Sequence, residues 1–403
     1  MNENDRLRFG SAPVSRRNLL RGAAALGAGV ALAACGSSAP NATQVLATQG
    51  PPSQPPPSVT GSAPPEATPT PTATPVPTPQ PSPEGELFIY NWADYIGDHT
   101  IADFEKKFGV KVTYDFFDTT DTQAAKISTG HSGYDLTFPT STYIKGYVGR
   151  KLIEPLDLSL IPNLTNLAPE WQNSSYDPGN AYSVPYFWWT TGVAYDTAKV
   201  KDTLTSWDAL WDPRWQGHLA MLDDYREAFA AALIKLGFSI NTVDETQLDQ
   251  ALALLVQQKP LLRTYTTDDI GQLSTGDVWV MHAWAGDVFQ VKPDKPTVTY
   301  YIPQEGAVRG SDTMVVLAGA KHPIAAYLFI NYMLDPQVSA NNTNTTGYMG
   351  PNKAAQQFID PAILADPGVN PGADLIARLQ EIQDLGDKEN LYSTRWTKLR
   401  AGA

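Results

Sequence analysis

The sequence predicts an α/β fold built on a parallel sheet, and three neighbouring segments carry this prediction. Residues 87–90 (Leu-Phe-Ile-Tyr) form an apolar run with the length of a buried strand. Residues 97–108 place apolar side chains on one helical face, and residues 110–114 alternate as a strand does. A strand, a helix and a strand with short connections place both strands parallel in one sheet.

Later segments repeat this alternation. Residues 134–138 and 278–282 are strand-like, and we expect helices at 226–236, closed by Gly237, and at 323–334, ended by Asp335-Pro336. No period of about 20–50 residues recurs, which excludes a repeat array.

Length and charge limit the classes of function. The chain has 403 residues, 42% of them hydrophobic, which is enough for two domains after removal of tails. Its 42 acidic and 29 basic residues give a net charge of −13. Nucleic acid and phosphate ligands need clustered Lys and Arg, so we expect no nucleic-acid partner.

The first 34 residues have the pattern of an export signal. Arg16-Arg17 precedes a short apolar run that ends at Cys35, the only cysteine of the chain. The paired arginines resemble the twin-arginine signal, and Leu32-Ala33-Ala34-Cys35 resembles a bacterial lipobox, which implies cleavage before Cys35 and lipidation of its sulfur. Removing five Arg and two acids changes the net charge to −13 − 3 = −16. No later apolar run reaches the roughly 18 residues of a membrane span, so we expect an anchored, exported protein in the periplasm or at the cell surface.

We interpret residues 35–85 as a lipidated cysteine followed by a disordered tether. Residues 36–84 hold 15 of the 33 prolines, interleaved with Ser, Thr, Ala and Gln, and contain no Lys or Arg. Such a composition favours extended polyproline-like conformers and cannot build a core.

Signatures of enzymes and cofactors are absent from the sequence. There is no nucleophile elbow, phosphate-binding glycine loop or dinucleotide fingerprint, and the five histidines are scattered without metal-ligand spacing. A lipidated Cys35 would leave no thiol for catalysis. We therefore expect no enzyme, no cofactor and no metal.

Aromatic residues stand beside acids where strands are expected to end. These clusters are residues 91–95, 222–227 and 284–287, and Ser311-Asp312 precedes another apolar run. In open α/β sheets, ligands bind at the carboxyl ends of strands. An aromatic face beside a carboxylate suits an organic cation, because the ring attracts the ammonium group and the carboxylate accepts its hydrogen bonds.

The same residues resemble the spermidine/putrescine-binding proteins of bacterial ABC importers. The resemblance runs from about Glu86 to the C-terminus through an ordered set of motifs: Tyr90-Asn91-Trp92-x-Asp94-Tyr95, Tyr134-Asp135-Leu136, Ser183-Val184-Pro185-Tyr186, 205–211, Asp223-Asp224-x-Arg226-Glu227, Gly347-Tyr348 and 396–399. It implies a periplasmic-binding-protein fold, in which two α/β lobes are joined by a hinge and hold the ligand in a cleft between them. The approximate lobes are 86–189 with 311–357 and 190–310 with 358–403.

The resemblance also implies the ligand-binding residues. They are Trp92, Asp94, Tyr95, Thr140, Asp224, Glu227, Trp284, Asp287, Asp312, Tyr348 and Gln383. Two positions depart from the family pattern, since Gly310 and Thr142 stand where the family usually has aromatic residues. Losing two rings could widen the cleft, weaken binding or change the ligand.

Several of these residues also have a structural interpretation. Asp224 and Glu227 have the spacing of a helix capping box. Trp92 and Trp284 could belong to the core, and Asp94, Asp287 and Asp312 could be solvated loop acids. We assign Trp207, Trp211 and Trp215 to packing, whereas Trp188 and Trp189 could pack in the hinge or line the cleft.

The predicted function is a monomeric binding protein that delivers putrescine or spermidine to an ABC permease and is held on the membrane through Cys35. Another small organic cation or a basic amino acid is the alternative ligand. Less favoured classes are a secreted amine-processing enzyme and a sensory lipoprotein that transports nothing.

Overall fold

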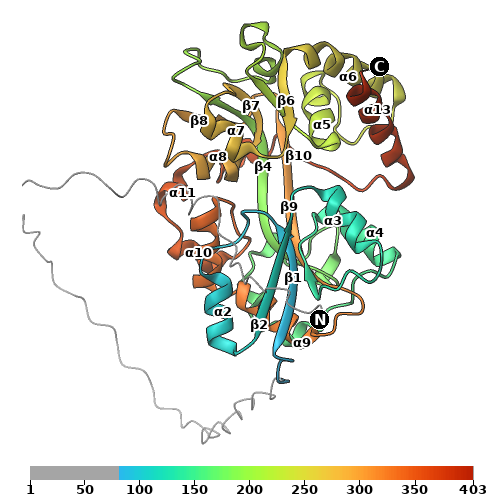
Figure 1. Ribbon diagram of the computed structural model, residues 1–403, viewed down its shortest axis with the longest axis vertical. Coiled ribbons are helices and arrows are strands. Elements are labelled where there is room, and N and C mark those ends of the chain that lie inside the picture. Colours follow the sequence, from blue (N-terminus) through green and yellow to red (C-terminus); the bar gives the residue numbers. More distant parts are fainter. Residues whose placement is uncertain (1–80, 403) are drawn as a thin grey trace, which may run out of the picture. The chain divides into compact units, whose positions relative to one another are not determined.

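Two long strands, β4 (Val184–Asp196) and β9 (Ala307–Val316), pair antiparallel through the middle of the fold (Figure 1). This is a computed structural model that describes residues 81–402, which fall within one unit, Gln80–Ala403. The predicted signal peptide, Cys35 and nearly all of the tether lie outside the described residues.

The remaining strands flank this central pair. They are β1 (Glu86–Trp92), β2 (Lys111–Phe117), β3 (Leu136–Thr137), β5 (Leu219–Leu222), β6 (Leu262–Thr266), β7 (Val280–Trp284), β8 (Val298–Tyr301) and β10 (Leu379–Glu381). The sheet order is β2-β1-β3-β9-β4-β7-β5-β6, with β8 on β4 and β10 on β9. The β2-β1-β3 and β7-β5-β6 groups are parallel, so each side of the central pair carries its own parallel sheet.

Helices cover both groups. They are α2 (Thr100–Phe108), α3 (Thr120–Ile127), α4 (Ile144–Gly149), α5 (Tyr225–Lys235), α6 (Glu245–Gln258), α7 (Asp269–Thr275), α8 (Ala285–Val291), α9 (Pro323–Met333), α10 (Pro336–Thr346), α11 (Pro361–Ala365), α12 (Ala373–Ile376) and α13 (Glu389–Ala401). None of the helices within 81–402 is long and apolar enough to cross a membrane.

Most expected elements are confirmed, with shifted ends. The helix expected from 97 begins at Thr100, because residues 97–100 form a turn closed by a hydrogen bond from the Thr100 amide to the Gly97 carbonyl. The helix expected at 226–236 is α5, and Gly237 follows it with φ of 78°. One expectation is wrong: Asp312 lies inside β9 and not on a loop before a strand, because its backbone pairs with Phe187 of β4.

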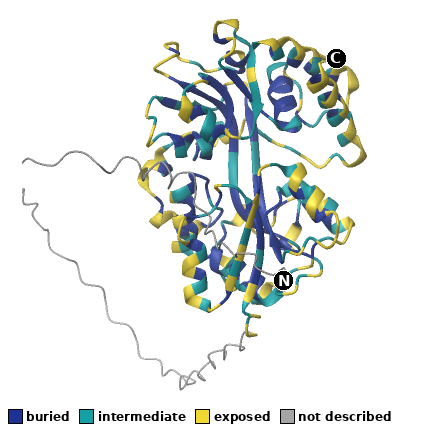
Figure 2. Ribbon diagram, viewed as in Figure 1, coloured by how far each residue is buried: buried dark blue, intermediate teal, exposed yellow. Residues whose placement is uncertain are grey.

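Two large hydrophobic cores lie at opposite ends of the central strands (Figure 1). One contains Leu87, Phe104 and Phe329, and the other contains Trp207, Leu219 and Phe229. Trp207 is fully buried, Trp215 is buried and Trp211 packs against the same core, which confirms their assignment to packing. The central strands are dark along most of their length in Figure 2, because both faces are covered.

Candidate functional site

Asp312 collects three hydrogen bonds from three other segments of the chain. Its carboxylate accepts from Tyr95 Oη at 2.8 Å, Thr140 Oγ1 at 2.8 Å and Trp189 Nε1 at 3.1 Å. Burial raises the pKa of Asp312 to about 6, although the three donors oppose this change. The structure therefore brings predicted residues from the ends of β1 and β3 onto β9, and it adds Trp189 from β4.

The end of β1 supplies two more predicted residues. Trp92 is its last residue, and its indole donates to the Phe138 carbonyl at 2.9 Å and packs on Phe117, with 4.5 Å between ring centroids. Asp94 follows in a left-handed conformation with φ of 51° and is exposed. This tight turn directs the chain inward, so that Tyr95 is buried while Asp94 is exposed.

A second carboxylate lies across from Tyr95. The Tyr348 hydroxyl donates to Asp287 Oδ1 at 2.7 Å, and the Tyr348 ring meets the Tyr95 ring edge-on at 4.7 Å. Asp287 lies in the first turn of α8, whose N-cap is Trp284. Burial raises the pKa of Asp287, and the Tyr348 hydrogen bond opposes this change.

Sequence reasoning missed Asp269, the first residue of α7. Its side chain is fully buried, Oδ2 accepts from the Trp284 amide at 3.0 Å, and Oδ1 has no partner. Burial and the neighbouring Asp287 raise the pKa of Asp269 well above its ordinary value. Asp268-Asp269 follows β6 just as the other acids follow strands, so the same rule could have found it.

Asp224 and Glu227 have different roles at the start of α5. Asp224 is the N-cap and accepts from the amides of Arg226 and Glu227 at 2.8 and 3.1 Å, so the capping interpretation holds for this residue. The Glu227 carboxylate does not complete a capping box. It is 3% exposed, accepts from Thr191 Oγ1 at 2.8 Å and lies 3.8 Å from His282 Nε2.

The Glu227 carboxylate has only part of its hydrogen-bonding capacity satisfied. Its Oε1 has no hydrogen-bond partner, and neither ring nitrogen of His282 has one. Burial, followed by the charge of Asp224, raises the pKa of Glu227 to about 8. Burial lowers the pKa of His282 to about 3, so His282 is neutral and supplies no positive charge to Glu227.

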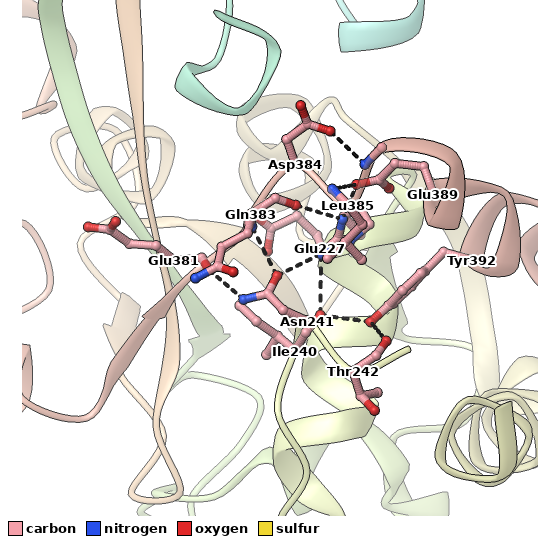
Figure 3. A network of polar contacts seen from close by, with 12 residues as sticks. Glu227, Ile240, Asn241, Thr242, Glu381, Gln383, Asp384, Leu385, Glu389 and Tyr392 are labelled. Atoms are coloured by element: carbon pink, nitrogen blue, oxygen red, sulfur yellow. Dashed lines mark hydrogen bonds and ion pairs between the residues drawn. The ribbon is translucent and has the colours of Figure 1, made fainter. Parts of the chain in front are cut away.

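Gln383 lies at the edge of this arrangement. Its backbone amide donates to Asn241 Oδ1 at 2.9 Å, and its carbonyl accepts from Arg226 at 3.3 Å, in the network that ties the C-terminal segment to α5 (Figure 3). The side chain is exposed, and none of the hydrogen bonds recorded for residues 81–402 joins it to the other predicted site residues.

The carboxylates of this site raise one another's pKa values. Asp224 raises the pKa of Glu227, Glu227 and Asp287 raise that of Asp269, and Asp287 and Asp312 raise that of Tyr348. We call Asp224, Glu227, Asp269, Asp287 and Asp312 the acidic cluster. Among the ion pairs of the described region, none joins this cluster to Lys or Arg, and the described residues contain no group suited to hold a metal ion. Arg226 is nearby, but its guanidinium bonds to Glu389 and Asn241.

Known proteins match nearly all of the described region. The model of the family described as bacterial extracellular solute-binding protein matches residues 99–371. The putrescine-binding periplasmic protein PotF of Escherichia coli is 35% identical over 338 residues, which cover 78% of this chain and 91% of PotF. The spermidine/putrescine-binding periplasmic protein of Salmonella typhimurium is 33% identical over 319 residues, covering 78% and 92%.

A solved structure agrees with these relatives. A spermidine/putrescine ABC transporter protein from Listeria monocytogenes superposes with a TM-score of 0.75 at 31% identity, covering 79% of this chain and 99% of its own. The fold is thus the periplasmic-binding fold of two α/β lobes that are joined by a hinge with a ligand cleft between them. The chain belongs to the family of bacterial extracellular solute-binding proteins.

Proposed function

We propose that this protein binds a polyamine, putrescine or spermidine, and delivers it to the permease of an ABC importer. The observation that carries the proposal is the acidic cluster, which lies among aromatic rings and has no Lys or Arg ion partner within the described region. Glu227, Asp269 and Asp312 are buried, and Asp224 and Asp287 are half-buried. Buried carboxylates without a counter-ion are costly, so a cluster of them favours a ligand that brings several positive charges. Relatives named for putrescine and spermidine support the same ligand class.

The ligand would lie across the hinge. Asp287 and Asp312 would hold one ammonium group beside the rings of Tyr95 and Tyr348, and Asp224 and Glu227 would hold a charge on the opposite side. Trp92 and Trp284 would form apolar walls, whereas Asp94, Thr140 and Gln383 would complete the polar rim. About micromolar affinity, roughly −8 kcal/mol, is within reach of such a site.

Closure of two lobes would trap the ligand. We assign 86–189 with 311–357 to the first lobe and 190–310 with 358–403 to the second. The separate hydrophobic cores at opposite ends of β4 and β9 support this division. Binding would close the lobes about the hinge, the closed form would dock on the permease, and opening would release the ligand.

The N-terminal segments would hold the protein at the membrane. A twin-arginine-type signal at 1–34 would export the chain, and Cys35 would carry the lipid. The Pro-rich tether would let a monomeric binding domain reach the permease, at roughly 3 Å per extended residue. Replacing Cys35 by Ser should release the protein from the membrane fraction.

The competing functions differ in what happens to the ligand. A solute-binding protein makes and breaks no bond, so putrescine incubated with the protein should be recovered intact by mass spectrometry, whereas an amine-processing enzyme would convert it. A basic amino acid or another organic cation would compete at the same site, and a sensory lipoprotein would release nothing to a permease.

Calorimetry of the purified protein tests the proposal. We expect about micromolar binding of putrescine or spermidine and weaker binding of arginine and choline. The double variant Asp287→Asn with Asp312→Asn should weaken polyamine binding by at least tenfold, while Asp294→Asn, which changes an exposed acid that is not part of the cluster, should leave it unchanged. Absence of heat with both amines well above micromolar concentration would refute the proposal.

A further inference from the structure

Trp189 is one of two half-buried residues in β4. Every residue of β4 is buried except Trp188 and Trp189. Trp189 packs against both large hydrophobic cores, which lie at opposite ends of the central strands. Trp189 therefore lies where the two halves of the fold meet, and it is half-buried there.

Gly310 makes room for this ring. Trp189 and Gly310 are directly paired in the β4–β9 ladder, so their side-chain positions lie on the same face. A Cβ placed on Gly310 would come within 2.2, 2.3 and 2.7 Å of three carbon atoms of the Trp189 ring. The indole thus lies across the glycine backbone and fills the space that a side chain at position 310 would occupy.

This placement sets the ring between two carboxylates. Phe187, Trp189 and Thr191 alternate onto one face of β4. Phe187 pairs with Asp312, and the Thr191 hydroxyl donates to Glu227. At about 3.4 Å per residue, Phe187 and Thr191 are about 14 Å apart, with Trp189 midway between them.

We infer that Trp189 contacts the ligand directly, as the floor on which the methylene chain of the polyamine lies between Asp312 and Glu227. The inference rests on the proposed function. An indole face attracts the methylene groups and the ammonium charges at their ends, and its Nε1 is fixed at 3.1 Å from Asp312 Oδ2. Gly310 positions this ring, so the aromatic wall that position 310 lacks is supplied from the paired strand.

A mutant cycle tests this arrangement by calorimetry with putrescine. We expect Trp189→Ala to weaken binding by at least tenfold and Trp189→Phe by about threefold, because phenylalanine retains an aromatic face. Gly310→Ala should weaken binding by several-fold by displacing the indole. In the Trp189→Ala background, however, Gly310→Ala should have no further effect, whereas a separate role of Gly310 would add to the loss.

Direct contact can be observed with protein labelled with 5-fluorotryptophan. The ¹⁹F resonance of Trp189 is assigned by its absence from Trp189→Phe, and it should shift on titration with putrescine. The resonance of Trp211, assigned in the same way with Trp211→Phe, should stay in place, because Trp211 is a core residue bonded to the Leu254 carbonyl. Trp189→Phe is the reference variant if Trp189→Ala does not fold.

The outcomes separate the two proposals. A wild-type protein that binds putrescine, with an unmoved Trp189 resonance or with unchanged affinity after Trp189→Ala, overturns the role of Trp189 alone. A wild-type protein that binds neither putrescine nor spermidine overturns the proposed function, and the inference falls with it.

Discussion

Replacing Glu227 by Gln should stabilise the ligand-free protein and impair ligand binding in the same variant. Glu227 is 3% exposed, bonds to Thr191 through one oxygen, and has no partner for the other. Glutamine has nearly the same shape and keeps an acceptor for the Thr191 hydroxyl, but it carries no charge at any pH. The variant therefore removes the charge of the side chain at position 227 and keeps its packing.

The effect on stability follows from the pKa. Burial raises the pKa of Glu227 from 4.5 to about 8. The stability that protonated Glu227 contributes is fully present below pH 4.5 and is lost as the pH rises towards 8, because the unfolded chain releases the proton first. At pH 7 the loss extends over 7 − 4.5 = 2.5 pH units, which at about 1.4 kcal/mol per unit is about 3 kcal/mol. Glu227→Gln should recover most of this at pH 7 and only about 1 kcal/mol at pH 5.

The effect on binding has the opposite sign. An ammonium group needs ionised Glu227, which is present in roughly one tenth of ligand-free molecules at pH 7. Wild-type affinity for putrescine should therefore rise as the pH increases from 6 to 8. The variant should bind on the order of 100-fold more weakly, as expected for loss of one partner of a buried charged hydrogen bond, and its pH dependence should be shallower.

Urea unfolding at pH 5 and 7, together with calorimetry at pH 6, 7 and 8, measures both effects. Asp294→Asn is the matched control, since it removes one charge at an exposed position of the same half of the fold. A Glu227→Gln protein that is less stable than wild type at pH 7, or that binds putrescine within threefold of wild type, would refute the reasoning.

Three further substitutions test neighbouring contacts. Asp312→Asn leaves one acceptor oxygen for three donors, so we expect a loss of about 1–3 kcal/mol in urea unfolding and at least tenfold weaker binding. Tyr348→Phe removes the hydrogen bond that lowers the pKa of Asp287; calorimetry below pH 7 should show several-fold weaker binding, and unchanged affinity would contradict this. Gly192→Ala would place a Cβ 2.5 Å from the Tyr301 carbonyl oxygen, so thermal unfolding should reveal a loss of about 1–3 kcal/mol.

The fold could be predicted where structure is local. The strand–helix–strand order after Glu86 depends on the periodicity of one short segment, and β1, α2 and β2 appear in that order. The central strands could not be predicted in the same way. Because both faces of β4 are buried along its 13 residues except at Trp188 and Trp189, it has no alternation of polar and apolar residues. Its partner β9 begins more than 100 residues later. Asp312 was consequently expected on a loop.

The types of residue that form the candidate site could be predicted from the sequence. Their electrostatic environment could be predicted less well. Aromatic residues beside acids pointed to Tyr95, Asp287 and Asp312, which now share a network of hydrogen bonds and ring contacts. Burial without a partner cannot be read from a sequence, so neither Asp269 nor the isolated oxygen of Glu227 was foreseen. Both features depend on how α7 and α5 pack against β7 and β4, and this packing is seen only in the tertiary structure.

The acidic cluster lowers the stability of the ligand-free protein and at the same time provides affinity for a cationic ligand. Each carboxyl that burial holds neutral must lose its proton before it can pair with an ammonium group, so the same desolvation that raises the pKa of Glu227 and Asp312 weakens binding at low pH. A polyamine removes this penalty at several carboxyls at once, because its charges replace the missing counter-ions. A cation that has one charge and an otherwise apolar body relieves the desolvation penalty at one end of the site only. Selectivity for multiply charged amines should therefore increase with pH, and it arises from how the fold buries its acids as much as from the shape of the cleft.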